Sequence, residues 1–425
     1  MGYGHQRAVH PLRGMAEEGI ITVGSTASVS DTERKLWRRM TGAYEFFSRA
    51  KGLPVFGPHL FSILDSMLKI PSFYPMRNLS STTFQVNLLE SLVDKGLCSG
   101  MLEITSTKNI PIITSFYASA IAADRKGCNK VYCIICDADI NRVWVAKNPW
   151  ESRVEYFAPC GKAAQRLRAY GVPDERIHLT GFPLPVELLG DETLDVLKKN
   201  LARRLSRLDP RGRFRARHGK NVAFFLGQDA GVPTGEEMLT ITYAVGGAGA
   251  QKEIGRRIAN SLRDKIQAGE IRLILVAGTR VEVKEYFDAV KADIAPDGDG
   301  IQIIHSESLH EFFDLFNHAL HETDLLWTKP SELSFYCALG IPIIMSPTIG
   351  SQEKFNKKWI REIRGGIKQE NPDYANHWLN DLLNRGTLAE AAWDGFLKAR
   401  KLGTFKIRQV LANGFLEKAT DPVMR

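Results

Sequence analysis

The chain of 425 residues is too long for one hydrophobic core, so its length favours two domains of about 200 residues each. With 44% apolar and 24% charged residues it has the composition of a globular protein, which excludes a disordered or low-complexity chain. Six cysteines without the spacing of a disulfide framework favour the cytoplasm, and the apolar runs fall well short of the roughly 20 residues that a membrane span needs.

The formal charge of +8 is concentrated in one segment. Between Arg203 and Lys220 there are eight basic residues and one acidic residue, so this stretch carries +7. A solvated helix end followed by a linker explains the charge most simply. Peripheral contact with anionic lipid headgroups is the second interpretation, and nucleic acid is the least favoured partner, so none is predicted.

The first half alternates short apolar runs with helical stretches, which is a βα pattern. The runs are continuous rather than alternating in polarity, as expected of parallel strands that are buried on both faces. A helix is predicted over Gly161–Tyr170, ended by Gly171 and Pro173. The predicted strands are Ile110–Thr114, Val131–Cys136, Arg153–Ala158 and Ile177–Thr180.

A second α/β unit follows Pro183–Lys220, a charged segment that ends in a basic run and is the best linker candidate. In this unit a glycine-rich turn, Gly246–Gln251, separates a strand from a helix over Lys252–Ile266. Further helices are predicted over 309–321 and 333–339. The predicted strands are Leu239–Val245, Arg272–Val276, Gln302–Ile304, Leu325–Trp327 and Ile341–Met345.

These elements predict an α/β fold with two Rossmann-like, doubly wound halves that face each other across a cleft. The predicted boundaries are an N-terminal acceptor domain over 1–185, a basic linker over 186–220, a C-terminal donor domain over 221–385, and a helical segment over 386–425 that packs back on the N-terminal domain.

Polar groups collect at the predicted strand ends of the second half. In open parallel sheets ligands bind beyond the carboxyl ends of the strands, where helix N-termini direct free N–H groups. Gly246–Gln251, Lys329–Glu332 and Ser351–Asn356 all fall at such ends, and backbone N–H groups there can hold a diphosphate without a metal. Taken singly, each piece is equally well explained as a tight turn, a helix cap or a solvated loop.

The order of these pieces resembles the donor half of GT-B glycosyltransferases, in the branch of the monogalactosyldiacylglycerol synthases and the peptidoglycan lipid-linked N-acetylglucosaminyltransferase. The motifs that carry the resemblance are Gly246–Gly249, Gly278–Arg280, Thr323–Lys329, Gly340–Pro342 and Ser351–Asn356. It implies a UDP-sugar or similar donor, a hydroxyl acceptor, and inversion at the anomeric carbon. A lipid is one candidate for the acceptor.

The first half is similar to the acceptor half of the same enzymes. Gly2–Ala8, "GYGHQRA", resembles their glycine-rich loop, although here no first strand precedes it, so either the start is misplaced or this edge of the sheet is rebuilt. The family's ribose-binding Glu is absent from Ser334–Leu339, and Glu332 is its expected substitute. Leu60–Leu68 and Trp37–Arg39 mix bulky apolar and basic residues, as an interfacial helix or a buried domain helix would.

Glycosyl transfer needs a base for the acceptor hydroxyl and groups that neutralise the negative charge of the departing diphosphate. His5 is the first candidate for the base, with Asp137 or Asp139 as the rival. The expected donor-binding residues are Gly246, Gly247, Ala248, Gly249, Arg280, Lys329, Ser331, Glu332, Gln352, Glu353 and Asn356. No metal and no other cofactor is expected, although Asp137-Ala138-Asp139 imitates a metal-binding DxD motif.

Two other classes remain open at this stage. A nucleotide-sugar epimerase on the same fold would need carboxylates at both faces of the sugar. A binding or regulatory relative would keep the fold and lose catalysis.

Overall fold

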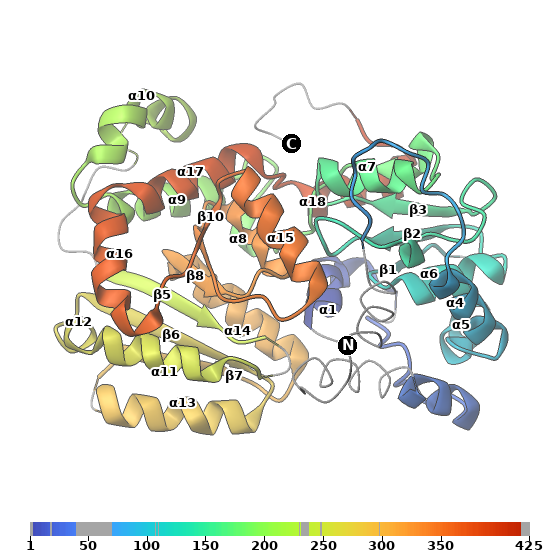
Figure 1. Ribbon diagram of the computed structural model, residues 1–425, viewed down its shortest axis with the longest axis horizontal. Coiled ribbons are helices and arrows are strands. Elements are labelled where there is room, and N and C mark those ends of the chain that lie inside the picture. The colour runs from blue at the N-terminus through green and yellow to red at the C-terminus, as the bar shows by residue number, and fades with distance from the viewer. Residues whose placement is uncertain are drawn as a thin grey trace. The chain divides into compact units, whose positions relative to one another are not determined.

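The computed structural model describes residues 3–17, 19–39, 70–106, 108, 110–228, 230, 238–246, 249–296 and 298–417. These residues form two compact units (Figure 1). The larger unit contains the described residues of 1–11 and 181–412 together with Glu417, and the smaller contains those of 12–180 and 413–416. The expected interfacial segment Leu60–Leu68 lies outside the described residues.

The larger unit is built on a parallel sheet of six strands in the order β10-β9-β8-β5-β6-β7. When the strands are numbered from β5, this is the strand order of the doubly wound dinucleotide-binding fold. The chain runs outward from β5 through β6 to β7 and in the other direction from β8 through β9 to β10, so the order reverses between β5 and β8. The strands are β5 Leu239–Ala244, β6 Ile271–Gly278, β7 Ile301–His305, β8 Leu325–Thr328, β9 Ile343–Met345 and β10 Gly366–Lys368. The predicted α/β class with parallel sheets is confirmed.

Helices cover this sheet because the right-handed connections between parallel strands place them there. α11 and α13, which follow β5 and β6, lie side by side, and α13 also contacts β6 and β7 (Figure 1). The helices of this unit are α1 Tyr3–Val9, α8 Val186–Leu189, α9 Asp195–Leu208, α10 Arg213–Leu226, α11 Lys252–Ser261, α12 Arg263–Gln267, α13 Val281–Ile294, α14 Leu309–Glu322, η4 Glu332–Leu339, α15 Ser351–Glu362, η5 Pro372–Tyr374, α16 Ala375–Asn384, α17 Thr387–Lys398 and α18 Gly403–Asn413.

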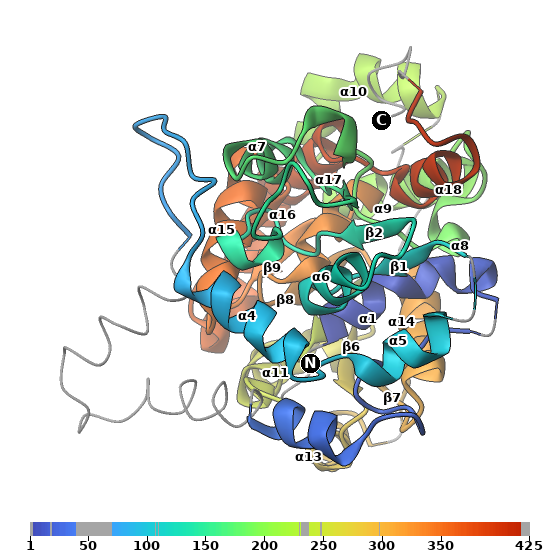
Figure 2. The same ribbon diagram turned by 90° about the vertical axis from the view of Figure 1, so that its right-hand side faces the viewer.

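The smaller unit has a parallel sheet of four strands in the order β1-β2-β3-β4, so its described strands are wound in one direction. The strands are β1 Ile112–Thr114, β2 Val131–Ile134, β3 Val154–Phe157 and β4 Ile177–His178. Its helices are α4 Phe84–Asp94, α5 Ser99–Ser106, α6 Tyr117–Arg125, η2 Arg142–Trp144, α7 Gly161–Ala169 and η3 Asp174–Arg176, with a further helix over 31–39. Helix α6 packs against β1 and β2 (Figure 2). The 3-10 helix η1 His10–Met15 leads into this unit from the larger one.

The segment predicted as a basic linker is largely helical, as α9 and α10, and belongs to the larger unit. The reason lies in Arg204, which is 1% exposed and donates from Nε to the carbonyl oxygen of Thr323 at 2.8 Å. Its Nη1 also donates to the carbonyl oxygens of Leu339 at 3.0 Å and Gly340 at 3.2 Å. Burial lowers the pKa of Arg204 to about 10. In a linker, Arg204 would be exposed to water; here it is a fixed part of the core.

The helices α17 and α18 make contacts within the larger unit, whereas residues 413–416 belong to the smaller unit. α17 contacts η4 and α9, and Thr404 of α18 donates its hydroxyl to the carbonyl oxygen of Leu184 within the larger unit. At Gly403 a Cβ would lie 2.2 Å from the carbonyl oxygen of Phe182, so only glycine permits this approach. Among the described residues, no helix is both long and apolar enough to cross a membrane.

We expect Arg204→Met to lower the free energy of unfolding by about 3 kcal/mol, because three buried carbonyl oxygens lose a charged donor. Urea denaturation followed by circular dichroism measures the change. The matched control is Arg213→Met, at an exposed position of α10, which should stay within about 0.5 kcal/mol of the parent. Equal effects of the two substitutions would contradict the structural role of Arg204.

Candidate functional site

The candidate site lies where the strand order of the larger sheet reverses, at the carboxyl ends of β5 and β8. Loops that leave two such neighbouring strands turn to opposite faces of the sheet, so a crevice opens between them. Gly246 follows β5 after Val245, and Lys329 follows β8 directly. The topology therefore brings together two of the segments that the sequence singled out.

The loop after β5 makes a tight turn that needs its glycines. The Gly249 N–H donates to the Gly246 carbonyl oxygen at 2.8 Å, and Gly249 has a φ of +71°. A Cβ at Gly246 would lie 2.6 Å from Cε of Lys329, and one at Gly249 would lie 3.1 Å from Cδ of Arg280. The turn is thus flanked by Lys329 and Arg280, two of the predicted cations. Gly247 and Ala248 lie outside the described residues.

Lys329 is already paired with a carboxylate. Its Nζ lies 2.8 Å from Oε1 of Glu353, and the other carboxylate oxygen accepts the N–H of Ile349 at 2.6 Å and of Gly350 at 3.3 Å. Glu353 therefore caps the first turn of α15 and holds Lys329 at the same time. This use of both oxygens differs from the expected role of Glu353 as a free acceptor for sugar hydroxyls.

The other predicted donor residues differ in how open they are. Gln352 is partly exposed in the first turn of α15, and Ser331 is partly exposed after β8. Asn356, in the same helix, is fully buried and engaged in contacts within the protein. Arg280 is exposed and pairs with Glu282 at 3.1 Å. The structure thus leaves Gln352 as the more accessible of the two amides.

The segment predicted as a glycine-rich loop of the first half is the helix α1, and it packs within the larger unit. The Tyr3 hydroxyl accepts the N–H of Thr279 at 2.9 Å, just beyond the end of β6, and lies 3.0 Å from the Thr279 hydroxyl. Arg7 donates from Nε to Oε1 of Glu332 at 3.2 Å. The helix is anchored to the rim of the sheet by these contacts.

Glu332 is consequently covered rather than open. It is 9% exposed, and a Cβ at Gly4 would lie 2.8 Å from its Oε2. Arg7 itself is 4% exposed and packs over the rings of three α14 residues, Phe312, Phe313 and Phe316. Glu332, the residue expected to take the place of the family's ribose-binding Glu, is therefore covered and paired with Arg7 in this structure.

Sequence reasoning missed the anchoring residues Tyr3, Arg7 and His10. His10 lies 3.1 Å from the carboxylate of Asp314 on α14. The three residues stand at positions i, i+4 and i+7, the spacing of one helix face, and this spacing was the available signal. His5, the first candidate for the base, is partly exposed on the same helix and makes contacts there.

The two candidate aspartates lie in the smaller unit, after β2, and have different surroundings. Asp139 is 0% exposed, and its oxygens lie 2.7 Å and 3.0 Å from Nε and Nη2 of Arg166. It also accepts the N–H of Ile140 at 3.0 Å. Asp137 is partly exposed and engaged in a contact. The geometry of Asp139 is that of a structural carboxylate, which leaves Asp137 as the more accessible of the two.

The pairing of Asp139 also bears on metal binding. A DxD motif grips a divalent ion with both carboxylates, and Asp139 directs both of its oxygens to Arg166. In the described part of the chain, no group of three His, Cys, Asp or Glu side chains is arranged to hold a metal ion.

No protein-family model matches the chain, and no curated protein matches it. The chain is similar to solved structures of UDP-GlcNAc 2-epimerases and of MurG. MnaA of S. aureus in complex with UDP is 13% identical over 80% of this chain and 85% of its own, with a TM-score of 0.44. MurG of Acinetobacter baumannii is 15% identical over 77% and 78%, with a TM-score of 0.43. The UDP-GlcNAc 2-epimerase of Neisseria meningitidis, bound to UDP-GlcNAc, is 12% identical over 84% and 89%, with a TM-score of 0.42.

We predict that Asp139→Asn lowers the free energy of unfolding by about 3 to 5 kcal/mol, because the buried charge of Arg166 loses its partner. Asp137→Asn, at a partly exposed carboxylate two residues earlier, is the control and should cost about 1 kcal/mol or less. Thermal and urea unfolding measure both. An Asp139→Asn protein as stable as the parent would overturn the structural role.

Proposed function

We propose that this protein binds a nucleotide-sugar, with UDP as the expected nucleotide, at the switch point of the larger sheet and transfers the sugar to a hydroxyl acceptor. The observation that carries the proposal is the glycine turn Gly246–Gly249, held between Lys329 and Arg280 at the carboxyl ends of β5 and β6. The order of motifs that resembles GT-B donor halves supports the same ligand.

The turn has the chemistry that a diphosphate requires. It leads into α11, whose first N–H groups and positive dipole end attract an anion. Lys329 and Arg280 add two cations beside it, so the departing diphosphate is neutralised without a metal ion. Gln352, partly exposed in the first turn of α15, offers an amide donor and acceptor to sugar hydroxyls.

The pairing of the carboxylates favours transfer over isomerisation. An epimerase that moves a proton between two faces of a sugar needs an acid and a base at that sugar. In the larger unit, Glu332 is engaged by Arg7 and Glu353 by Lys329, so both already have a cationic partner. Transfer requires a single base at the acceptor hydroxyl, for which His5 and Asp137 are the proposed candidates.

A donor-binding test separates the parts of this proposal. Isothermal titration of Lys329→Met should show about tenfold weaker binding of both UDP and UDP-N-acetylglucosamine, because a charge-assisted contact to phosphate is lost. Gln352→Ala should weaken the UDP-sugar more than UDP, because Gln352 is assigned to the sugar. Lys358→Met, at an exposed lysine of the same helix as Gln352, is the matched control and should bind like the parent.

The products then decide the reaction. Nuclear magnetic resonance of UDP-sugar incubated with the protein and a diacylglycerol acceptor should show UDP and a new glycoside. A C2 epimer formed without acceptor would replace transfer by isomerisation. Absence of binding by UDP and every UDP-sugar tested would remove the proposal altogether, and equal losses in Gln352→Ala for both ligands would contradict the role of Gln352.

The basic helix α10 supports the further proposal that the protein makes peripheral contact with an anionic membrane. Of the eight basic residues counted in the sequence, Arg203, Arg204 and Arg207 are engaged by carbonyl oxygens or Asp324 of the larger unit. The exposed residues Arg213, Arg217, Lys220 and Phe224 follow one another at i, i+4, i+7 and i+11, which is one face of the helix, and Arg217 is also paired with Glu390 at 2.7 Å. Phe224 is 81% exposed, and α10 lies at the edge of its unit beside α17 (Figure 1).

A stripe of cations with one exposed aromatic ring fits a bilayer surface, where the cations meet headgroups and the ring enters the interface. We expect Arg213→Glu with Lys220→Glu to reduce co-sedimentation with phosphatidylserine vesicles by at least about tenfold, since each cation contributes about 1 kcal/mol. Lys358→Glu with Arg408→Glu makes the same change of charge elsewhere and should bind like the parent. Equal losses in the two double variants, or tighter binding to DNA than to vesicles, would contradict a membrane face.

A further inference from the structure

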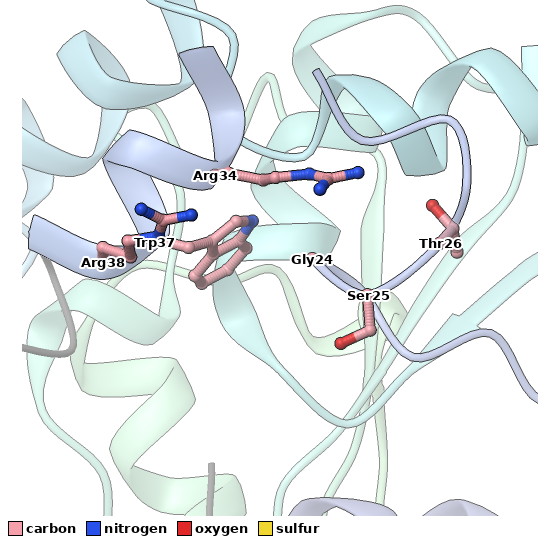
Figure 3. A pocket seen from close by; sticks show the side chains of 6 residues that line it. All are labelled: Gly24, Ser25, Thr26, Arg34, Trp37 and Arg38. Carbon is pink, nitrogen blue, oxygen red and sulfur yellow. The ribbon is translucent and has the colours of Figure 1, made fainter. Parts of the chain in front are cut away.

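The smaller unit has an open hollow of its own, lined by residues other than those assigned to the donor (Figure 3). Its volume of about 450 Å³ is within the range of small-ligand sites. The lining residues are Gly24, Ser25 and Thr26 from one loop and Arg34, Trp37 and Arg38 from the helix over 31–39.

The helix is held in place by a buried carboxylate. Glu33 is 0% exposed and accepts the Ser99 hydroxyl at 3.0 Å and the Gly100 N–H at 2.8 Å. Its other oxygen accepts the indole N–H of Trp37 at 3.0 Å, which orients that ring at the hollow. A Cβ at Gly24 would lie 3.0 Å from Nε1 of Trp37, so the loop passes directly over the ring. Both walls of the hollow are therefore fixed by local contacts.

Two cations line the hollow without a carboxylate to balance them. Arg34 and Arg38 stand one helical turn apart, and Figure 3 shows Arg34 extended toward Thr26 and Arg38 on the other side of the Trp37 ring. Arg34 donates from Nε to the Val29 carbonyl oxygen at 3.3 Å, and within the described parts of the chain neither arginine has an ion pair. Glu33 lies next to them in sequence, but both of its oxygens are occupied by other donors.

Hydroxyl groups complete the opposite wall. Ser25 is exposed at the hollow, and Oγ1 of Thr26 is buried without a hydrogen-bond partner in the described structure. A buried hydroxyl without a partner is costly unless a ligand or a water molecule satisfies it. The combination of two guanidinium groups, two hydroxyls and an indole ring is complementary to an anion that carries a carbon skeleton.

We propose that this hollow is a binding site for an organic phosphate ester, with Arg34 and Arg38 supplying the positive charge for the phosphate and Trp37 the surface for the organic part. A planar guanidinium matches two phosphate oxygens at once, which a lysine does not. The ligand is either the phosphate headgroup of a lipid or a soluble phosphate ester, because both present the same group. The site is formed by the smaller unit alone and does not depend on the nucleotide-sugar proposal.

Calorimetric titration of the full chain with glycerol 3-phosphate, dihexanoylphosphatidic acid and inorganic phosphate tests the proposal. We expect the two esters to bind, and Arg34→Ala and Arg38→Ala each to weaken them by about tenfold or more. Thr26→Val, which removes the hydroxyl and keeps the volume, should weaken them by a smaller factor. Arg39→Ala is the matched control, because Arg39 is the next residue of the same helix and does not line the hollow.

Each outcome has a defined meaning. Tighter binding of the lipid ester than of glycerol 3-phosphate assigns a headgroup, and equal binding assigns a soluble ester. The proposal is overturned if no ester binds, if inorganic phosphate binds as tightly as the esters, or if Arg39→Ala loses as much affinity as Arg34→Ala. Lys329→Met should leave these titrations unchanged, and a loss of ester binding in that variant would place the ligand at the donor site instead.

Discussion

The reversal of strand order between β5 and β8 is the constraint on which the candidate donor site depends. Because parallel strands place their carboxyl ends at one edge of the sheet, the loops after β5, β6, β8 and β9 share that edge whatever their sequence. The sequence of those loops then decides the chemistry. Glycine at 246 and 249 permits close approach of Lys329 and Arg280, and larger residues at these two positions would force the cations away from the turn.

The rim of this sheet is electrically balanced before any ligand binds. Lys329 is matched by Glu353 and Arg7 by Glu332; the carboxylate is the more buried partner in the first pair and the arginine in the second. A diphosphate at the proposed donor site would compete with Glu353 for Lys329, whereas Arg280 is exposed and pairs with Glu282. This arrangement favours binding that rearranges the first turn of α15, because Glu353 holds that turn and Lys329 together.

The strands could be predicted from the sequence because burial on both faces makes each of them a continuous apolar run, as in Val131–Ile134 and Leu325–Thr328. The strand β10 was missed because Gly366–Lys368 is short, partly exposed and not apolar at both ends. The helix α1 was taken for a loop because its glycines suggested one, and its real determinants are the tertiary contacts of Tyr3 and Arg7. At the candidate site, the residue types and their proximity were predictable, whereas the pairing of Glu332 and Glu353 was not, since it depends on which side chains the fold places opposite them.

The same limit explains why net charge alone says so little about this chain. The arginines that make the sequence basic fall into two physical classes that composition cannot separate. Arg166 and Arg204 are buried, with Asp139 or backbone carbonyl oxygens as fixed partners, so their charge is compensated within the protein. Arg34, Arg38 and the exposed cations of α10 keep their guanidinium or ammonium groups at the surface. Only this second class is available to an anionic ligand, and burial rather than charge count decides which residues belong to it.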